Sequence, residues 1–408
     1  MAPIFGAGGR LVFGPLSKIR PPVFDVREDL SMHARAGAGL ATGNDGVDGF
    51  AEAAARAALG LGGAPCQLAL VFAGRANLDH AEEGLAAVYD RLRPEALVGC
   101  GAQGVVGSGR ELEDGGVAVW AASLDAEVDP FHVQVGRTGE SVVISGVPEL
   151  DGADAAILLA DPYSFPAEPL LSRLSDARPN LPVVGGMASA SGLLVGDEAV
   201  SGGAVGVVLR GGGVRTCVSQ GARPVGPEMT ITAGEGNVIE ELASEPALER
   251  VRRALDELGP IEQQQASHGL LLGVVTDANK PDYESGDFLI RGIVAADEDS
   301  GALTVATQVR VGQTVCLQVR DAAAAHEDLV EALDREAAAI GRPPAGALLF
   351  TCNGRGSQMF GTPDHDARAV DEAFSHAPTG GFFCAGEFGP VGGRNFVHGF
   401  TATLAVFP

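Results

Sequence analysis

The chain carries little positive charge. Its 408 residues contain 53 Asp and Glu against 28 Lys and Arg, for a formal net charge of −25. Only Lys18 and Lys280 are lysines. A surface this acidic repels phosphate backbones and anionic lipid. We therefore expect neither nucleic acid nor a membrane as a partner.

Long apolar runs are also absent. No stretch approaches the roughly 18 to 20 apolar residues that a membrane-spanning helix needs. The first residues, Met1 to Gly6, lack the basic region and apolar core of a signal peptide. We therefore expect a cytoplasmic protein. Hydrophobic types still make up 46% of the residues, which is enough for two or three packed units.

Several familiar motifs are missing. The six cysteines form no C-x-x-C pair, so neither a zinc knuckle nor a thioredoxin-like motif is present. No G-x-x-x-x-G-K-[ST] occurs, which excludes a P-loop. Residues 99–104 do read G-x-G-x-x-G. The predicted helix precedes this motif instead of following it, so a tight turn is favoured over a dinucleotide site.

One pattern of predicted elements is used three times. Segments 68–124, 154–210 and 346–407 each read as strand, helix, strand, glycine-rich turn and strand. The opening strand and the glycine turn are about 30 to 40 residues apart, the length of a β-α-β unit with parallel strands. We predict a mixed α/β (α+β) fold in which three β-α-β-turn-β units form mixed sheets flanked by helices.

A different stretch, residues 225–345, separates the second and third units. Helices are predicted from Glu245 to Leu258 and from Asp321 to Ile340. Strands are predicted at 268–275, 288–295, 303–308 and 314–320, with a turn or loop at 276–282. We divide the chain into an N-terminal extension (1–33) and two packed halves (34–224 and 225–408).

The third unit carries the densest polar chemistry. Its two glycine-rich loops follow the ends of adjacent strands that are predicted to be parallel, where open α/β sheets bind ligands. Glycines let backbone amides approach a ligand, and arginines can hold a carboxylate. The predicted ligand-binding residues are Asn353, Arg355, Gly356, Glu387, Gly389, Arg394, Asn395 and His398.

Other interpretations of these loops stay open. Arg355 and Glu387 could form a structural ion pair that locks the two loops together. Alternatively, Cys352 or Cys384 with His398, or Glu387 as an acid/base, could act on a small substrate. No G-x-S-x-G nucleophile motif is present, and we assign no catalytic residue.

A metal site is considered at Asp364-His365-Asp366, which Asp371 and Glu372 follow. An Asp before a helix usually caps it, and acidic first turns favour the helix dipole. The eight histidines form no H-x-x-x-H pair. We therefore favour helix capping here and predict no metal ligand.

Specific strings near the C-terminus carry a resemblance to a known family. They are L-F-T-C-N-G-R-G-S-Q-M-F-G at 349–361 and G-G-F-F-C-A-G-E-F-G-P-V-G-G-R-N-F-V-H-G-F-T-A at 380–402. Similar strings are V-G-C-G-A-Q-G-V-V-G-S-G-R-E-L-E-D-G at 98–115 and T-A-G-E-G-N-V-I-E-E-L at 232–242. Together they resemble the FIST domain family, ligand-sensing domains named for F-box and intracellular signal transduction proteins. The resemblance covers about 35–408, so the two predicted halves look like FIST N and FIST C portions.

The resemblance implies a cytoplasmic sensor of a small ligand, for which an amino acid or a derivative is the usual proposal. Because the resemblance fills the chain, we expect no fused effector domain and expect a separate partner protein to carry the signal. One subgroup of the family consists of haem-bearing nitric-oxide sensors with a histidine ligand. We expect no cofactor and keep haem as an alternative, because the chain contains no C-x-x-C-H. A homodimer is considered because repeated units expose sheet edges.

Overall fold

The computed structural model describes residues 34–43, 46–138, 141–267, 269–276, 278, 280, 283 and 285–408. The predicted extension, residues 1–33, lies outside the described residues, as does part of the predicted loop at 276–282. In the described part of the chain, no helix combines the length and the apolar character needed to cross a membrane.

The predicted unit occurs three times, which confirms the fold class. Each time, two parallel strands joined by helical structure precede a hairpin, and a closing strand returns antiparallel to the first strand. The first unit comprises β2 (Leu68–Gly74), α2 (Arg75–Leu78), α3 (Ala81–Leu92), β3 (Ala96–Ala102), β4 (Val105–Gly107), β5 (Arg110–Leu112) and β6 (Val117–Ser123). The second comprises β9 (Ala155–Ala160), α4 (Ala167–Ala177), β10 (Val183–Met187), β11 (Leu193–Val195), β12 (Glu198–Val200) and β13 (Ala204–Gly211). The third comprises β22 (Gly346–Cys352), α8 (Ser357–Phe360), α9 (His365–Ala373), β23 (Thr379–Cys384), β24 (Glu387–Val391), β25 (Arg394–His398) and β26 (Thr401–Phe407).

The hairpins join the units in a cycle, because each hairpin extends the sheet of a different unit. β4 of the first unit pairs with β23 of the third, and β24 of the third pairs with β10 of the second. β11 of the second unit pairs with β3 of the first, which closes the cycle. No unit therefore completes its own sheet.

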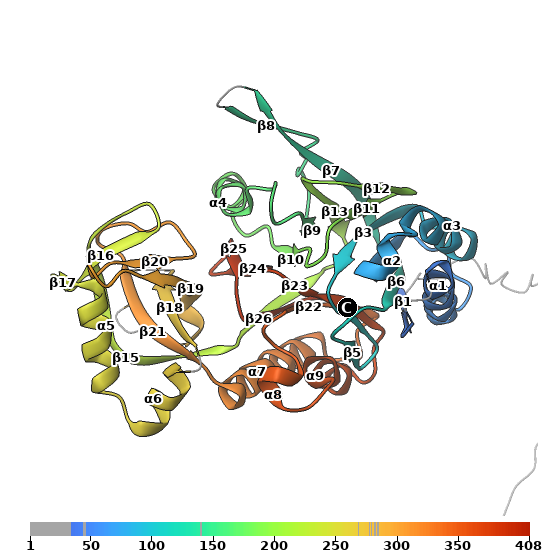
Figure 1. The fold of residues 1–408 in the computed structure, drawn as a ribbon. Coiled ribbons are helices and arrows are strands. Elements are labelled where there is room, and N and C mark those ends of the chain that lie inside the picture. The colour runs from blue at the N-terminus through green and yellow to red at the C-terminus, as the bar shows by residue number, and fades with distance from the viewer. Residues whose placement is uncertain are drawn as a thin grey trace, which may run out of the picture. The chain divides into compact units, whose positions relative to one another are not determined.

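A further strand precedes each unit and pairs with its closing strand. These strands are β1 (Arg35–Ala41), β7 (Ala126–Thr138) and β14 (Arg215–Gln220). Helix α1 (Val47–Leu61) connects β1 to β2. β8 (Ser141–Ser145) is the last strand of its sheet and pairs with β7, and the two form the arm that projects in Figure 1.

An antiparallel barrel is inserted before the third unit and is drawn in yellow and orange in Figure 1. Its strands are β15 (Ala222–Glu235), β16 (Val238–Leu242), β18 (Leu270–Val275), β19 (Phe288–Ala296), β20 (Leu303–Val305) and β21 (Thr314–Arg320), with β17 (Glu245–Pro246) appended. A pairing between β15 and β16 closes the barrel. Its helices are α5 (Ala247–Asp256) and α6 (Pro260–Ser267), and α7 (Ala322–Ile340) leads into the third unit.

The elements predicted for residues 225–345 are confirmed, with small shifts at their ends. The predicted helices correspond to α5 and α7, and Asp321 caps α7 by accepting hydrogen bonds from two backbone amides. β20 ends at Val305, before the predicted Gln308. The predicted division between the halves, 224/225, lies within β15 at the beginning of the barrel.

One apolar core is shared by the three units. Phe72 of the first unit stacks on Phe382 of the third, with ring centroids 5.0 Å apart. Leu159 of the second unit belongs to the same buried cluster. The outer faces of the three sheets pack against helices, namely α1 and α3, α4, and α7 and α9. This arrangement explains why the strands read as continuous apolar runs, because both of their faces are buried.

A glycine in each second strand lets the parallel strands pair closely. Gly99, Gly185 and Gly381 lie opposite Val71, Leu158 and Leu349, respectively. A Cβ at these glycines would lie 2.0, 2.0 and 1.8 Å from the opposite carbonyl oxygen. This shared requirement supports the equivalence of the three units.

We expect Gly381→Ala to lower the free energy of unfolding by about 1–3 kcal/mol, the cost of overpacking a tight site. The new Cβ would meet the Leu349 carbonyl at 1.8 Å. Gly136→Ala in β7 is the matched control, because a Cβ there has no atom within 4 Å. Urea denaturation measures both variants, and equal stabilities would contradict the proposed close approach.

Candidate functional site

Arg355, a predicted ligand residue, is engaged inside the protein. Its side chain is buried, and Nε and Nη2 donate to Asp366 Oδ2 and Oδ1 at 2.6 and 2.9 Å. Thr351 Oγ1 also donates to Asp366, at 2.7 Å. Burial acts to raise the pKa of Asp366, but Arg355 and the hydrogen bonds outweigh it and hold the pKa below its ordinary value. The partner of Arg355 is therefore Asp366 of α9 rather than Glu387.

The loop that contains Asn353 and Gly356 is held by β23 of its own unit and by the first unit. Asn353 N donates to Cys384 O at 3.0 Å, while the residue itself is exposed. Gly356 adopts φ 80°, and a Cβ there would lie 3.0 Å from the Glu113 carboxylate. Glu113 accepts hydrogen bonds from Ser357 N and Oγ at 2.7 and 2.8 Å. The glycine thus lets the first unit hold this loop.

Glu387 is buried at the beginning of β24. Thr401 donates to Glu387 Oε2 from N and Oγ1, at 3.2 and 2.7 Å. Burial raises the pKa of Glu387 to about 8, and the Thr401 hydrogen bonds and Arg355 oppose this only in part. Glu387 is therefore predominantly protonated at neutral pH. Within the described residues, its Oε1 has no hydrogen-bond partner.

His398 lies opposite Glu387 in the hairpin of β24 and β25 and is 2% exposed. Burial lowers the pKa of His398 to about 4, so the ring is neutral. Its Nε2 lies 3.0 Å from the carbonyl oxygen of Gly389, which fixes Nε2 as the donor. A buried ring whose Nε2 is already bonded does not fit the axial ligand of a haem.

Cys352 and Cys384 are opposite each other in the parallel strands β22 and β23. Burial raises the pKa of the Cys352 thiol to about 12 and that of Cys384 well above its ordinary value. A thiolate is the reactive form of cysteine. Neither thiol ionises near neutral pH, which weighs against the nucleophilic role considered from the sequence.

Arg394 and Asn395 lie at the other end of the same hairpin. Asn395 is buried, and its side chain accepts from Val183 N and donates to Leu181 O, both at 2.8 Å. Arg394 is exposed and contacts Asp176 at 2.8 Å. The structure therefore separates Arg394 from the buried Arg355, although both belong to the predicted set.

A cleft of about 460 Å³ lies where this hairpin meets α4 and the barrel. Three arginines line it: Arg291 and Arg310 from the barrel and Arg394 from β25. Arg291 is 8% exposed and donates to Val397 O at 2.9 Å and to Glu168 Oε1 at 3.2 Å. Gln308 and Gln313 add amide groups to the wall.

The sequence patterns did not identify Arg291, Arg310 or Glu168. Arg291 and Glu168 come from segments 123 residues apart, and the surrounding strings contain no motif. A clustering of arginine in so acidic a chain is visible only after folding.

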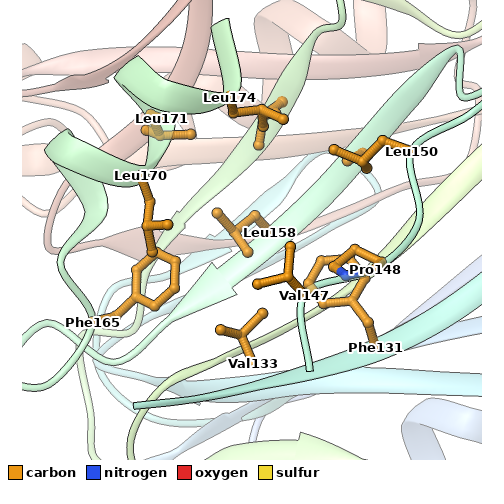
Figure 2. A pocket seen from close by; sticks show the side chains of 12 residues that line it. Phe131, Val133, Val147, Pro148, Leu150, Leu158, Phe165, Leu170, Leu171 and Leu174 are labelled. Atoms are coloured by element: carbon orange, nitrogen blue, oxygen red, sulfur yellow. The ribbon is translucent and has the colours of Figure 1, made fainter. Parts of the chain in front are cut away.

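Two smaller cavities differ in chemistry from the cleft. Figure 2 shows one of about 90 Å³ beside α4, whose lining is almost entirely apolar and includes Phe131, Leu158 and Leu174. It offers no polar group to orient a polar ligand. The other, of about 150 Å³, lies at the carboxyl ends of β2, β9, β10 and β23, and Arg75 and Asp161 line it. We call it the strand-end pocket.

Comparison with known families now identifies the class of protein. The FIST N domain matches residues 67–245, and the FIST C domain matches residues 247–390. The chain belongs to the FIST family. The two matched domains meet inside the barrel, whereas the predicted halves meet at 224/225.

Relatives of nearly full length occur in mycobacteria. An uncharacterized protein of Mycobacterium tuberculosis (strain ATCC 25618 / H37Rv), Rv0628c, is 44% identical over 382 residues, which is 91% of this chain and 99% of the relative. The uncharacterized protein Mb0898c of Mycobacterium bovis (strain ATCC BAA-935 / AF2122/97) is 42% identical over 383 residues, 91% of this chain and 98% of the relative.

We expect Arg355→Met to lower the free energy of unfolding by about 3–5 kcal/mol, because it leaves Asp366 buried without its cation. The double variant Arg355→Met/Asp366→Leu should recover part of that loss. Urea denaturation provides both values. A stable Arg355→Met protein that has lost only ligand binding would instead restore the predicted ligand role.

Stability should fall as pH rises from about 5 to 9. The pKa of Glu387 in the folded state is about 8, above its ordinary value. The folded state therefore binds this proton more tightly than the unfolded chain does, and the resulting contribution to stability is lost as pH rises through 8. The effect of Glu387 is on the order of a few kcal/mol. Glu387→Gln should flatten the profile measured by denaturation at each pH. A residual slope is expected from Glu111, because burial raises its pKa to about 7. A slope that Glu387→Gln leaves unchanged would contradict the raised pKa of Glu387.

Proposed function

We propose that this FIST protein is a cytoplasmic sensor that binds a small carboxylate-bearing metabolite, an amino acid or a derivative, in the cleft. The observation that carries the proposal is the grouping of Arg291, Arg310 and Arg394 around about 460 Å³ of space. The chain as a whole has a net charge of −25. A locally positive cleft in such a chain favours an anionic ligand.

The charged side chains of the cleft differ in how far their hydrogen bonds within the protein leave them able to bind a ligand. Arg291 is held by Glu168 and by a backbone carbonyl, so it contributes mainly a fixed positive charge. Arg310 is exposed and can turn toward a carboxylate, which guanidinium groups bind in a bidentate manner. Arg394 is also exposed, and it can bind a carboxylate by exchanging its ion pair with Asp176. The Glu168 side chain is 42% exposed and can face an ammonium group. These groups together suit an amino acid or a derivative that keeps its carboxylate.

The position of the cleft suggests how binding produces a signal. One wall belongs to the barrel and the other to the second and third units, so a ligand contacts both. A ligand that binds one arrangement of these parts more tightly shifts the population toward it. We propose that a separate partner protein reads the change and that no resident cofactor takes part. A homodimer stays a prediction, for which β8 is an exposed edge.

Isothermal titration with a panel of L-amino acids, N-acyl derivatives and dicarboxylates tests the proposal. We expect at least one to bind, and we expect Arg310→Ala and Arg394→Ala to weaken it about tenfold or more, the value of a charge-assisted hydrogen bond. Arg342→Ala is the matched control, because Arg342 is exposed and does not line the cleft.

Three outcomes would overturn parts of this proposal. Unchanged ligand affinity in both arginine variants would show that the ligand does not bind in the cleft. A loss of affinity confined to Arg75→Ala would instead indicate binding in the strand-end pocket. Conversion of the bound ligand, detected by mass spectrometry, would favour the enzyme interpretation. A Soret band in the absorbance spectrum of the purified protein would favour the haem alternative.

A further inference from the structure

Two histidines from different helices bring their ring nitrogens together. Nδ1 of His326, in α7, lies 3.1 Å from Nε2 of His365, in the first turn of α9. The two helices pack against each other, as Figure 1 also shows. Among the described residues, neither of these two nitrogens makes another hydrogen bond.

Asp366 determines which nitrogen of His365 carries a lone pair. Nδ1 of His365 lies 2.9 Å from Oδ1 of Asp366. The carboxylate also accepts from the Arg355 guanidinium, so it is ionised and can only accept. Nδ1 of His365 therefore carries the hydrogen, and Nε2 presents its lone pair to His326. A carboxylate behind an imidazole is the arrangement that orients metal-binding histidines.

The space between the rings suits either a proton or a metal ion. His326 can donate Nδ1–H to His365, or it can take its other tautomer and present a second lone pair. Zinc binds imidazole at about 2.0–2.1 Å, so two ligands at a tetrahedral angle have nitrogens ~3.3 Å apart. The observed separation of 3.1 Å is close to that value.

The surroundings favour a cation. His326, though not His365, lines a groove of about 270 Å³ between α7 and α9, together with Asp334 and Glu372 and with no lysine or arginine. Phe360 stacks on the His365 ring at 3.4 Å, which restricts rotation of the ring and leaves its edge free. The His365 side chain keeps 15% exposure and His326 is exposed, so an ion can enter from solvent.

One of the two grounds for favouring helix capping in this segment is absent from the structure, although Asp366 does lie in the first turn of α9. Asp364 holds the N-cap position of α9, but its side chain makes no capping hydrogen bond. Its Oδ1 accepts instead from Glu111 N at 2.7 Å. The Asp364-His365-Asp366 motif thus joins α9 to β5 and orients His365.

We propose that His326 and His365 form a binding site for a divalent transition-metal ion of the class that prefers imidazole, with Zn²⁺, Ni²⁺ and Cu²⁺ as members. In the described ranges, no group of three or more His, Cys, Asp and Glu side chains is arranged to hold a metal. Water therefore completes the coordination. The ion ties α7, which follows the barrel directly, to α9 of the third unit.

The test uses tag-free full-length protein stripped with EDTA and titrated with ZnCl₂ or NiCl₂ by calorimetry. We expect one saturable site per chain, with His326→Ala and His365→Ala each weakening it at least about tenfold, as loss of a coordinating imidazole requires. His376→Ala is the matched control, because that exposed histidine contacts Asp371 and does not line the groove.

A Co²⁺ absorption spectrum supplies an independent readout. Visible bands with nitrogen coordination should appear in the wild type and be absent from His326→Gln, whose exposed position keeps the fold intact. Binding that is equal in wild type and His326→Ala, or no saturable binding at all, would overturn the proposal. Because no carboxylate ligand is present, these results are independent of the proposed sensor function.

Discussion

The exchange of hairpins between the three units is the constraint on which the rest of the structure depends. A second strand such as β10 would otherwise leave one row of backbone N–H and C=O groups unpaired, and the cycle of hairpins pairs all three rows. It also brings the carboxyl ends of strands from different units together. Ser189 of the second unit shows the result, because it accepts from Gln103 N of the first unit and donates to Phe383 O of the third.

Because of this arrangement, Arg355, Arg310 and Arg394 lie in different environments, one buried and two exposed. Arg355 lies where units meet in the interior, so its charge must be balanced by a buried carboxylate, and Asp366 supplies it. Arg310 and Arg394 lie where the barrel meets the hairpin and are exposed to solvent. The glycine-rich loops of the third unit are consequently structural in their buried parts, whereas Arg394 at the beginning of β25 is exposed.

The inserted barrel is a separate sheet that α7 connects to the third unit. α7 runs from the end of the barrel into the third unit and packs on both β14 and α9. The histidine pair includes a residue of α7, whereas the cleft is lined by barrel residues, by α4 and by β25.

The sequence by itself determined the three repeated units, the parallel strands within them, α5 and α7, and four strands of the inserted segment, β18 to β21, whereas β15 and β16 were not predicted. These features follow from local periodicity, from caps such as Asp321 and from turn glycines. Family membership was also visible in the C-terminal strings. Only the tertiary structure decided the exchange of hairpins, the pairing of Arg355 with Asp366, the arginine cleft and the approach of His326 to His365. Each of these depends on which distant segments pack together, and a local pattern of polarity does not encode the partner of a buried charge or of a strand edge.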